Sequence, residues 1–207
     1  MSSGLTRYND HMAKHSRSTL GQGEAVRQSI VEAANRLFYH GGYNATSFTD
    51  IAEAAGIPRG NFYYYYKSKD DLLAAVIDTR IVKIRTMLAE WDTGEPDPRQ
   101  RLKYFAQIIR RSEKEIIRYG CPMGSLNSEL GKAQPALKAQ VKKMFDLFID
   151  WLTRQITMIG CAQAPHLALE MMGRTQGMAV MAHIYGDRHY LRAQLAELDV
   201  WIESLSN

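Results

Sequence analysis

The sequence predicts an all-α protein, and three observations indicate this fold class. Apolar residues recur at intervals of three and four along most of the chain, which is the spacing of one helix face. Two S-x-x-D patterns, Ser47 with Asp50 and Ser68 with Asp71, are typical of helix starts. No segment alternates apolar and polar residues as a half-buried strand would.

Length and composition are ordinary for a globular protein. The chain has 207 residues, of which 45% are hydrophobic and 23% are charged, which suits one or two domains. The formal charge is +4, but it is spread along the chain and supports a nucleic-acid partner only weakly. We find no secretory leader and no apolar run of about eighteen residues, so we expect a cytoplasmic protein without a membrane span.

The sequence offers little catalytic chemistry. Cys121 and Cys161 stand far apart, with no C-x-x-C pair and no closely spaced histidines, so we expect no metal site, no cofactor and reduced thiols. There are no paired carboxylates on one helix face, no glycine-rich phosphate loop and no H-E-x-x-H motif. Cys121 with His183 or His189 is imaginable as nucleophile and base, but no spacing supports it, and we do not expect an enzyme.

The first elements are an arm and a helix. Residues 1–23 are polar and are expected to form a flexible N-terminal arm. A helix is expected from Glu24 to His40, because apolar residues recur there at helical spacing. The pair Gly41-Gly42 ends it.

Two short helices joined by a tight turn are expected next. The first begins near Phe48, and Gly56 ends it because glycine accepts the left-handed backbone of a C-cap. Pro58 suits the first turn of a second helix, expected from Arg59 to Tyr65. Together they form a helix-turn-helix, a unit that can place its second helix in the major groove of DNA.

The outward face of the second short helix carries side chains suited to DNA. Arginine can bind guanine with two hydrogen bonds, and asparagine can pair with adenine. Glycine permits close backbone approach, whereas hydroxyls and lysine suit phosphate oxygens. The candidate DNA-binding residues are Thr46, Ser47, Arg59, Gly60, Asn61, Tyr63, Tyr64 and Lys69. Each alone is equally compatible with packing or a solvated charge, but all agree in register.

The run TSFTDIAEAAGIPRGNFYYYYKSKDDL resembles the DNA-binding domain of the tetracycline-repressor (TetR) family of bacterial transcription regulators. The resemblance covers about Glu24 to Val76. It consists of a T-x-x-D-I-A-x-A-A-G helix, a short helix that ends in an aromatic cluster, and K-x-x-L. Pro58 stands where the family often has a small hydroxyl residue, and Tyr64 stands where histidine is common.

The rest of the chain is expected to be helical. A long connecting helix should run from Ser68 to about Trp91, and glycine and proline mark breaks after it. Further helices are expected at 99–119, 126–130, 136–159, 166–185 and 188–205. We therefore expect a helix-turn-helix DNA-binding domain over 24–70 and a helical domain over 71–207. The resemblance assigns effector binding and dimerisation to the second domain.

The resemblance also implies a pocket for a small-molecule effector between the middle helices. A mostly apolar cavity with a few polar groups suits a small organic ligand. The alternative for each residue is simple core packing. The candidates are Tyr104, Phe105, Ile108, Cys121, Phe145, Phe148, Ile149, Met172 and Gln176.

The last two helices carry one stripe of small residues and one of leucines, which allows close packing. The stripes form either intramolecular core or an isologous dimer interface, and the resemblance favours a homodimer. The candidate interface residues are Ala168, Met172, Thr175, Ala179, Ala182, Leu191, Leu195, Leu198 and Ile202.

Cys121 permits a second kind of regulation. Its segment, GCPMGSL, is similar to the G-C-x-x-G-[NS]-L segment of a TetR subgroup in which some members respond to electrophiles or oxidants. A helix N-terminus and Arg118 nearby would lower the pKa of a thiol. The alternative is an inert cysteine at a helix junction.

The expected function is transcription regulation. We expect a homodimeric repressor that binds a pseudo-palindromic operator in double-stranded DNA and is released by a small molecule. The alternatives are a Cys121-based sensor of electrophiles or redox state, an enzyme, and a non-DNA sensor on the same helical scaffold.

Overall fold

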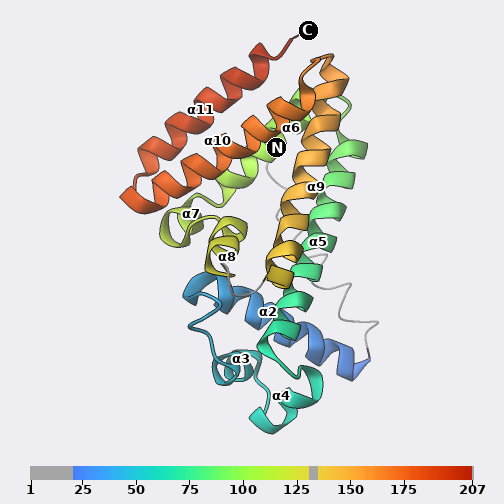
Figure 1. Ribbon diagram of the computed structural model, residues 1–207, viewed down its shortest axis with the longest axis vertical. Helices are drawn as coiled ribbons and strands as arrows, with labels where there is room; N and C mark the ends of the chain where they lie inside the picture. The colour runs from blue at the N-terminus through green and yellow to red at the C-terminus, as the bar shows by residue number, and fades with distance from the viewer. Residues whose placement is uncertain (1–20, 131–134, 207) are drawn as a thin grey trace, which may run out of the picture.

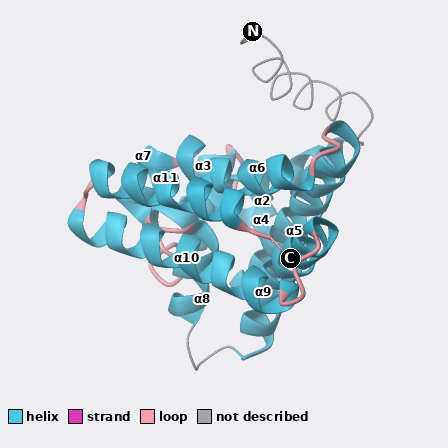
Figure 2. Cartoon of the chain, turned by 90° about the horizontal axis from the view of Figure 1, so that it is seen from above, coloured by secondary structure: helices cyan, strands magenta, loops and turns pink. Residues whose placement is uncertain are grey.

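The chain folds into helices joined by short turns. The computed structural model describes residues 21–130 and 135–206, and it contains no strand in these ranges, so the all-α prediction is confirmed (Figures 1 and 2). The helices are α2 (Gln22–Gly41), α3 (Phe48–Ala55), α4 (Arg59–Tyr65), α5 (Lys69–Gly94), α6 (Pro98–Arg111), α7 (Glu113–Tyr119), α8 (Pro122–Leu130), α9 (Pro135–Ile159), α10 (Ala164–Tyr185) and α11 (Arg188–Ser204). Of the expected arm, residues 1–20 lie outside the described ranges, and α2 already begins at Gln22.

The helices are arranged along one long axis. Helices α2, α3 and α4 form one end of the molecule, and α10 and α11 lie side by side towards the other (Figure 1). Helices α5 and α9 run next to each other between the two ends. None of the described helices combines the length and the apolar character that a membrane span requires.

Local capping explains where α3 begins and ends and where α5 begins. The Ser47 side chain accepts a hydrogen bond from the Asp50 amide, and the Asp50 carboxylate accepts one from the Ser47 amide at 2.8 Å, which completes a capping box. Gly56 ends α3 with a φ of 69°, in the left-handed region. The Ser68 hydroxyl caps α5 through the Asp71 amide. These starts and stops are the ones that the sequence predicts.

Two apolar clusters form the core. One joins α6, α9, α10 and α11 around Trp151 and Leu195, both fully buried. The other holds the helix-turn-helix, with Ile51 and Phe62, together with residues of α5, α8 and α9 such as Val141. The helix-turn-helix therefore shares its core with the second half of the chain.

The structure divides the helix expected at 99–119. Helix α6 ends at Arg111, and α7 begins at Glu113, because Ser112 leaves the helical conformation between them. The break lets the Glu113 carboxylate reach α11, where it pairs with Arg188 at 2.9 Å and Arg192 at 2.7 Å. Helix α8 also starts earlier than expected, at Pro122.

Candidate functional site

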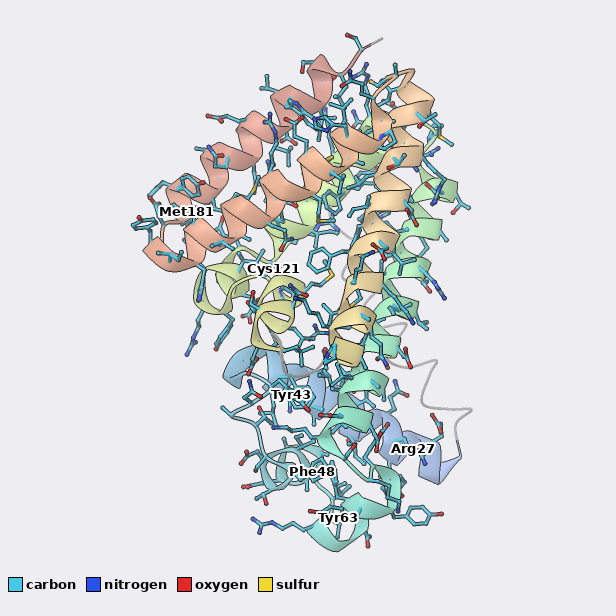
Figure 3. The ribbon with its side chains drawn as sticks, in the orientation of Figure 1. Arg27, Tyr43, Phe48, Tyr63, Cys121 and Met181 are labelled. Carbon is cyan, nitrogen blue, oxygen red and sulfur yellow. The ribbon has the colours of Figure 1, made fainter. Side chains whose placement is uncertain are left out.

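The outer face of α4 is open to solvent. Arg59, Gly60 and Asn61 are exposed. Tyr63 and Tyr64 are 56% and 74% exposed, which is unusual for large aromatic side chains. Figure 3 shows Tyr63 at the extremity of the molecule that α4 forms. These five predicted residues thus lie together on one projecting surface.

The inner face of α4 is anchored by aromatic packing. Phe62 is 1% exposed, and its ring centroid lies 4.6 Å from that of Phe48 in α3. Tyr66, four residues on, is also buried, and burial raises the pKa of its hydroxyl. The Arg27 guanidinium from α2 covers the Tyr65 and Tyr66 rings at 5.8 and 5.7 Å. The tyrosine run is therefore divided between an outer and an inner face.

Two predicted phosphate-binding hydroxyls are engaged locally. Ser47 is exposed, but its hydroxyl donates to the Asp50 carboxylate at 2.7 Å, and this bond holds the pKa of Asp50 below its usual range. Thr46 differs from the expectation, because its side chain is buried and its hydroxyl donates to the Gly42 carbonyl at 2.7 Å. The Thr46 hydroxyl thus holds the α2–α3 turn and faces away from solvent.

Lys69 also has an internal role. Its ammonium donates to the carbonyl oxygens of Tyr43, Asn44 and Thr46 at 2.9, 3.3 and 3.2 Å, and it lies 4.5 Å from the centre of the Tyr43 ring. An ammonium has three protons to donate, so a phosphate would have to displace one of these bonds. Sequence reasoning missed this contact because the turn and α5 are far apart in the chain.

The candidate effector residues lie mostly in the core of the C-terminal half. Phe105, Phe148 and Met172 are buried in that cluster, and Ile108, Cys121, Phe145 and Ile149 pack against it. The Gln176 amide lies 3.9 Å from the Met172 sulfur. Tyr104 is set apart, because its hydroxyl donates to Glu95 at 3.1 Å, which raises the pKa of that hydroxyl.

A surface depression occurs elsewhere. It has a volume of about 780 Å³ and is lined by Arg110, Arg111, Ser112, Glu113, Lys114, Glu115 and Arg192. None of the nine candidate effector residues lines it. The effector pocket therefore stays a prediction, with core packing as the observed role of most of its residues.

Cys121 caps the N-terminus of α8. Its sulfur accepts a hydrogen bond from the Gly124 amide at 3.5 Å, and its side chain is half-buried. Arg80 of α5 donates to the Pro122 carbonyl at 3.0 Å, and burial lowers the pKa of its guanidinium. Tyr39 of α2 donates to the Gly120 carbonyl at 2.9 Å, and burial raises its pKa to about 12. The cysteine thus stands where α2, α5 and α8 meet.

The nine candidate interface residues do not form an accessible surface. All of them are between 0% and 5% exposed within the single chain. They are intramolecular core, because α10 packs on α9 and α11, and α11 packs on α6 and α10. For these residues the core interpretation holds and the interface assignment is wrong.

The opposite face of the same two helices is apolar and open. Its exposed large side chains are Leu169, Val180, Met181, Ile184 and Tyr185 on α10 and Val200 on α11. Gly173 and Gly177 lie between them, and a methyl group added at either would touch nothing within 4 Å. Figure 3 shows Met181 at the outer edge of this helix pair. Sequence periodicity could not find this face, because α10 is apolar on most of its sides.

Metal ligands do not gather in the described part of the chain. Among residues 21–130 and 135–206, no group of three or more His, Cys, Asp or Glu side chains could hold a metal ion.

Comparison with known proteins connects this geometry to a family. Residues 30–76 match the family described as bacterial regulatory proteins, tetR family. This segment contains most of α2, all of α3 and α4, and the start of α5.

Individual proteins extend the similarity beyond that segment. The HTH-type transcriptional repressor DhaR of Mycobacterium sp. strain GP1 is 26% identical over 126 residues, which cover 60% of this chain and 62% of DhaR. The chain therefore spans less than two thirds of that relative. The HTH-type transcriptional regulator TtgR of Pseudomonas putida is 25% identical over 199 residues, covering 91% of this chain and 93% of TtgR. A crystal structure of a TetR transcriptional regulator from Legionella pneumophila has 26% identity and a TM-score of 0.76, covering 89% of this chain and 98% of that one.

Proposed function

Because this chain belongs to the TetR family of bacterial regulatory proteins, we propose that it is a sequence-specific DNA-binding transcription regulator. The observation that carries the proposal is the divided face of α4. On one face of α4, polar and tyrosine side chains project into solvent. On the other face, Phe62 is buried and packs against Phe48 of α3. A short rigid helix with an exposed arginine and an exposed asparagine is suited to reading base edges in a major groove. We propose no catalytic activity.

The DNA contacts are proposed residue by residue. Arg59 and Asn61 contact base edges, because their side chains can form paired hydrogen bonds with guanine and adenine. Tyr63 and Tyr64 contact phosphate oxygens through their exposed hydroxyls. Gly60 lies between Arg59 and Asn61 and allows the backbone to approach the groove.

We propose a homodimer that uses the open apolar face of α10. Contiguous exposed apolar surface marks interaction sites, and Val180, Met181 and Ile184 present such a surface. A two-fold dimer would place two copies of α4 on the two halves of a pseudo-palindromic operator. Binding both halves together raises affinity far above that of one subunit.

The proposed mode of control is repression relieved by a small molecule. Helix α5 links the two ends of the molecule, because Lys69 holds the α2–α3 turn and Leu88 is buried in the C-terminal core. A ligand that shifts α5 would change the spacing of the two α4 helices. The two half-sites could then not be engaged together, and the dimer would leave the operator.

Selection of duplexes from a random pool tests the proposal. We expect the wild-type protein to enrich a two-fold symmetric sequence. Arg59→Ala should weaken binding to it by about 1–3 kcal/mol and relax the preference at one position of each half-site. Lys114→Ala is the control, because it removes an equal charge far from α4. A protein that binds no duplex better than an unrelated polyanion at low salt would refute the proposal.

A second candidate is control through Cys121, since this half-buried sulfur caps α8 at the junction with α2 and α5. Alkylation there would displace the α8 start. N-ethylmaleimide should abolish operator binding by the wild type and leave Cys121→Ser unaffected. Cys161→Ser is the matched control, because Cys161 is the buried second thiol. An equal response of wild type and Cys121→Ser would end this candidate.

A further inference from the structure

The turn between α2 and α3 is held by a carboxylate from α8. The amides of Tyr43 and Asn44 donate to the two oxygens of Glu129, at 2.8 and 2.6 Å. Both amides therefore bind one side chain that comes from the other half of the chain. Hydrogen bonds to a charged acceptor are about twice as strong as neutral ones.

Gly42 is shaped to this carboxylate. Its φ is +86°, a backbone conformation that favours glycine. A methyl group placed on Gly42 would lie 3.0 Å from Oε1 of Glu129 and 3.4 Å from Oε2. The glycine thus provides both the bend of the chain and the space in which Glu129 reaches the turn.

The turn is held from its other side by Lys69. The Lys69 ammonium donates hydrogen bonds to three carbonyl oxygens of the turn. The Glu129 carboxylate accepts hydrogen bonds from two backbone amides of the same turn. The N–H groups of the turn therefore face an anion on α8, and its carbonyl groups face a cation on α5. Each charge favours the orientation that the other requires.

Helix α8 connects this turn to the middle of the molecule. It lies directly beside α2, with Tyr43 just beyond its end (Figures 1 and 3). Its first turn receives a hydrogen bond from Arg80 at Pro122. Gly124 lies so close to α10 that an added methyl group would be 2.8 Å from the Gln176 amide oxygen. A displacement of α8 would therefore change contacts at both of its ends: those with Arg80 and Gln176 at its start, and those with the α2–α3 turn at its end.

We propose that Glu129 is a positioning residue that makes the orientation of α3 and α4 depend on the position of α8. This inference rests on the proposed DNA-binding function and adds a route of control to it, besides the movement of α5. The turn leads directly into the α3 capping box at Ser47. A shift of about 1 Å breaks hydrogen bonds of this length, so a small movement of α8 releases the turn and lowers operator affinity.

Glu129→Gln tests this role with little change of shape. The amide group keeps one acceptor but turns a donor towards a backbone donor. Glu115→Gln is the matched control, because Glu115 also reaches α2, pairing with His40 at 3.1 Å, without touching the turn. Both variants lose one negative charge, so a general electrostatic effect on DNA binding would be equal in the two.

The measurements are operator affinity and hydrogen exchange. Glu129→Gln should weaken binding to the selected operator about tenfold and accelerate exchange of the Tyr43 and Asn44 amides, and Glu115→Gln should do neither. By reciprocity of coupling, operator should slow exchange of the α8 amides in the wild type and in Glu115→Gln, but not in Glu129→Gln. A residue that only stabilised the fold would not change this last response.

The outcomes separate this inference from the function on which it rests. If the wild type selects an operator and Glu129→Gln equals it in affinity and in α8 protection, the role of Glu129 is wrong and the proposed function stands. If the wild type selects no operator, both fail. Should Glu129→Gln not fold, Glu129→Asp keeps the charge on a chain one methylene shorter and is expected to show the same losses. Wild-type behaviour of Glu129→Asp would then overturn the inference.

Discussion

Single side chains divide the helix-turn-helix into a surface that faces solvent and a scaffold that fixes it. Phe62 and Tyr66 are buried, while Tyr63 and Tyr64 are exposed. This division follows from helix geometry, because residues four apart share a face. The same rule explains why the five successive aromatic residues from Phe62 to Tyr66 need not form one hydrophobic patch.

Gly60 offers a test in which stability and function move in opposite directions. A methyl group at this helical position would touch nothing within 4 Å, so Gly60→Ala should raise the free energy of unfolding by up to about 1 kcal/mol. It should nevertheless weaken operator binding, because the methyl group stands on the proposed DNA-facing surface. Denaturant unfolding and fluorescence anisotropy measure the two effects.

Gly94→Ala is the control for that experiment. Gly94 ends α5 and is equally free of neighbours, but it lies far from α4. Its replacement should leave operator affinity unchanged. Unchanged affinity in Gly60→Ala as well would show that the α4 backbone does not approach DNA closely.

In the helix-turn-helix, the sequence predicts contacts between residues that are close together in the chain, but not contacts between distant segments. The capping box at Ser47 and the left-handed Gly56 depend on neighbours in the chain, and the structure confirms both. Thr46, Lys69 and Glu129 make their contacts through the α2–α3 turn, and the partners of Lys69 and Glu129 lie on distant segments. No periodicity or motif specifies such contacts, so they became visible only in the folded chain.

At the scale of elements, a buried charge explains the break that the sequence missed. The apolar spacing from 99 to 119 suits one helix, but Glu113 is only 8% exposed and pairs with two arginines of α11. A carboxylate is rarely buried without such partners. The change of direction at Ser112 therefore serves to connect α7 to α11.

The pH dependence of stability should reveal this ion pair. The hydrogen bond from Arg192 and the nearby positive charges hold the pKa of Glu113 below its usual value of 4.5. Because the pKa of Glu113 is lower in the folded protein than in the unfolded chain, the ionised carboxylate stabilises the fold at pH values above its pKa in the unfolded chain. This contribution is lost as the pH falls through its pKa in the folded protein. Glu113→Gln should lower the free energy of unfolding at pH 7 by about 1–2 kcal/mol. The difference from wild type should shrink as the pH falls below about 4.

Denaturant titrations at several pH values measure that difference. Asp150→Asn is the control, because Asp150 is exposed on α9 and its replacement should have little effect at any pH. A Glu113→Gln deficit that persists unchanged in acid would mean that shape, and not charge, accounts for the loss.

For the whole molecule, the arrangement of α10 and α11 decides how two chains can meet. The small-residue and leucine stripes are used inside the chain, so they cannot serve a second subunit. Because α10 is apolar around most of its circumference, spacing alone could not say which side is inside. Burial settles that question and leaves Val180, Met181 and Ile184 in solvent.

A charge on this open face should separate the proposed dimer without unfolding the chain. Ile184 is 62% exposed, so Ile184→Arg should leave the free energy of unfolding of one chain nearly unchanged. In a dimer that buries this face, the guanidinium would be desolvated without a partner, which costs several kcal/mol. We therefore expect Ile184→Arg to be monomeric in sedimentation and to bind operator about a hundredfold or more weakly, because only one half-site is engaged at a time.

Two controls make the expected result specific to that face. Val82 of α5 is 60% exposed, and Val82→Arg should leave both the dimer and operator binding intact. Leu195→Ala opens a cavity in the core and should cost about 2–5 kcal/mol of stability without producing a folded monomer. If Ile184→Arg stays dimeric while Val82→Arg dissociates, the subunits meet through α5, and the two α4 helices must be spaced by a different symmetry axis.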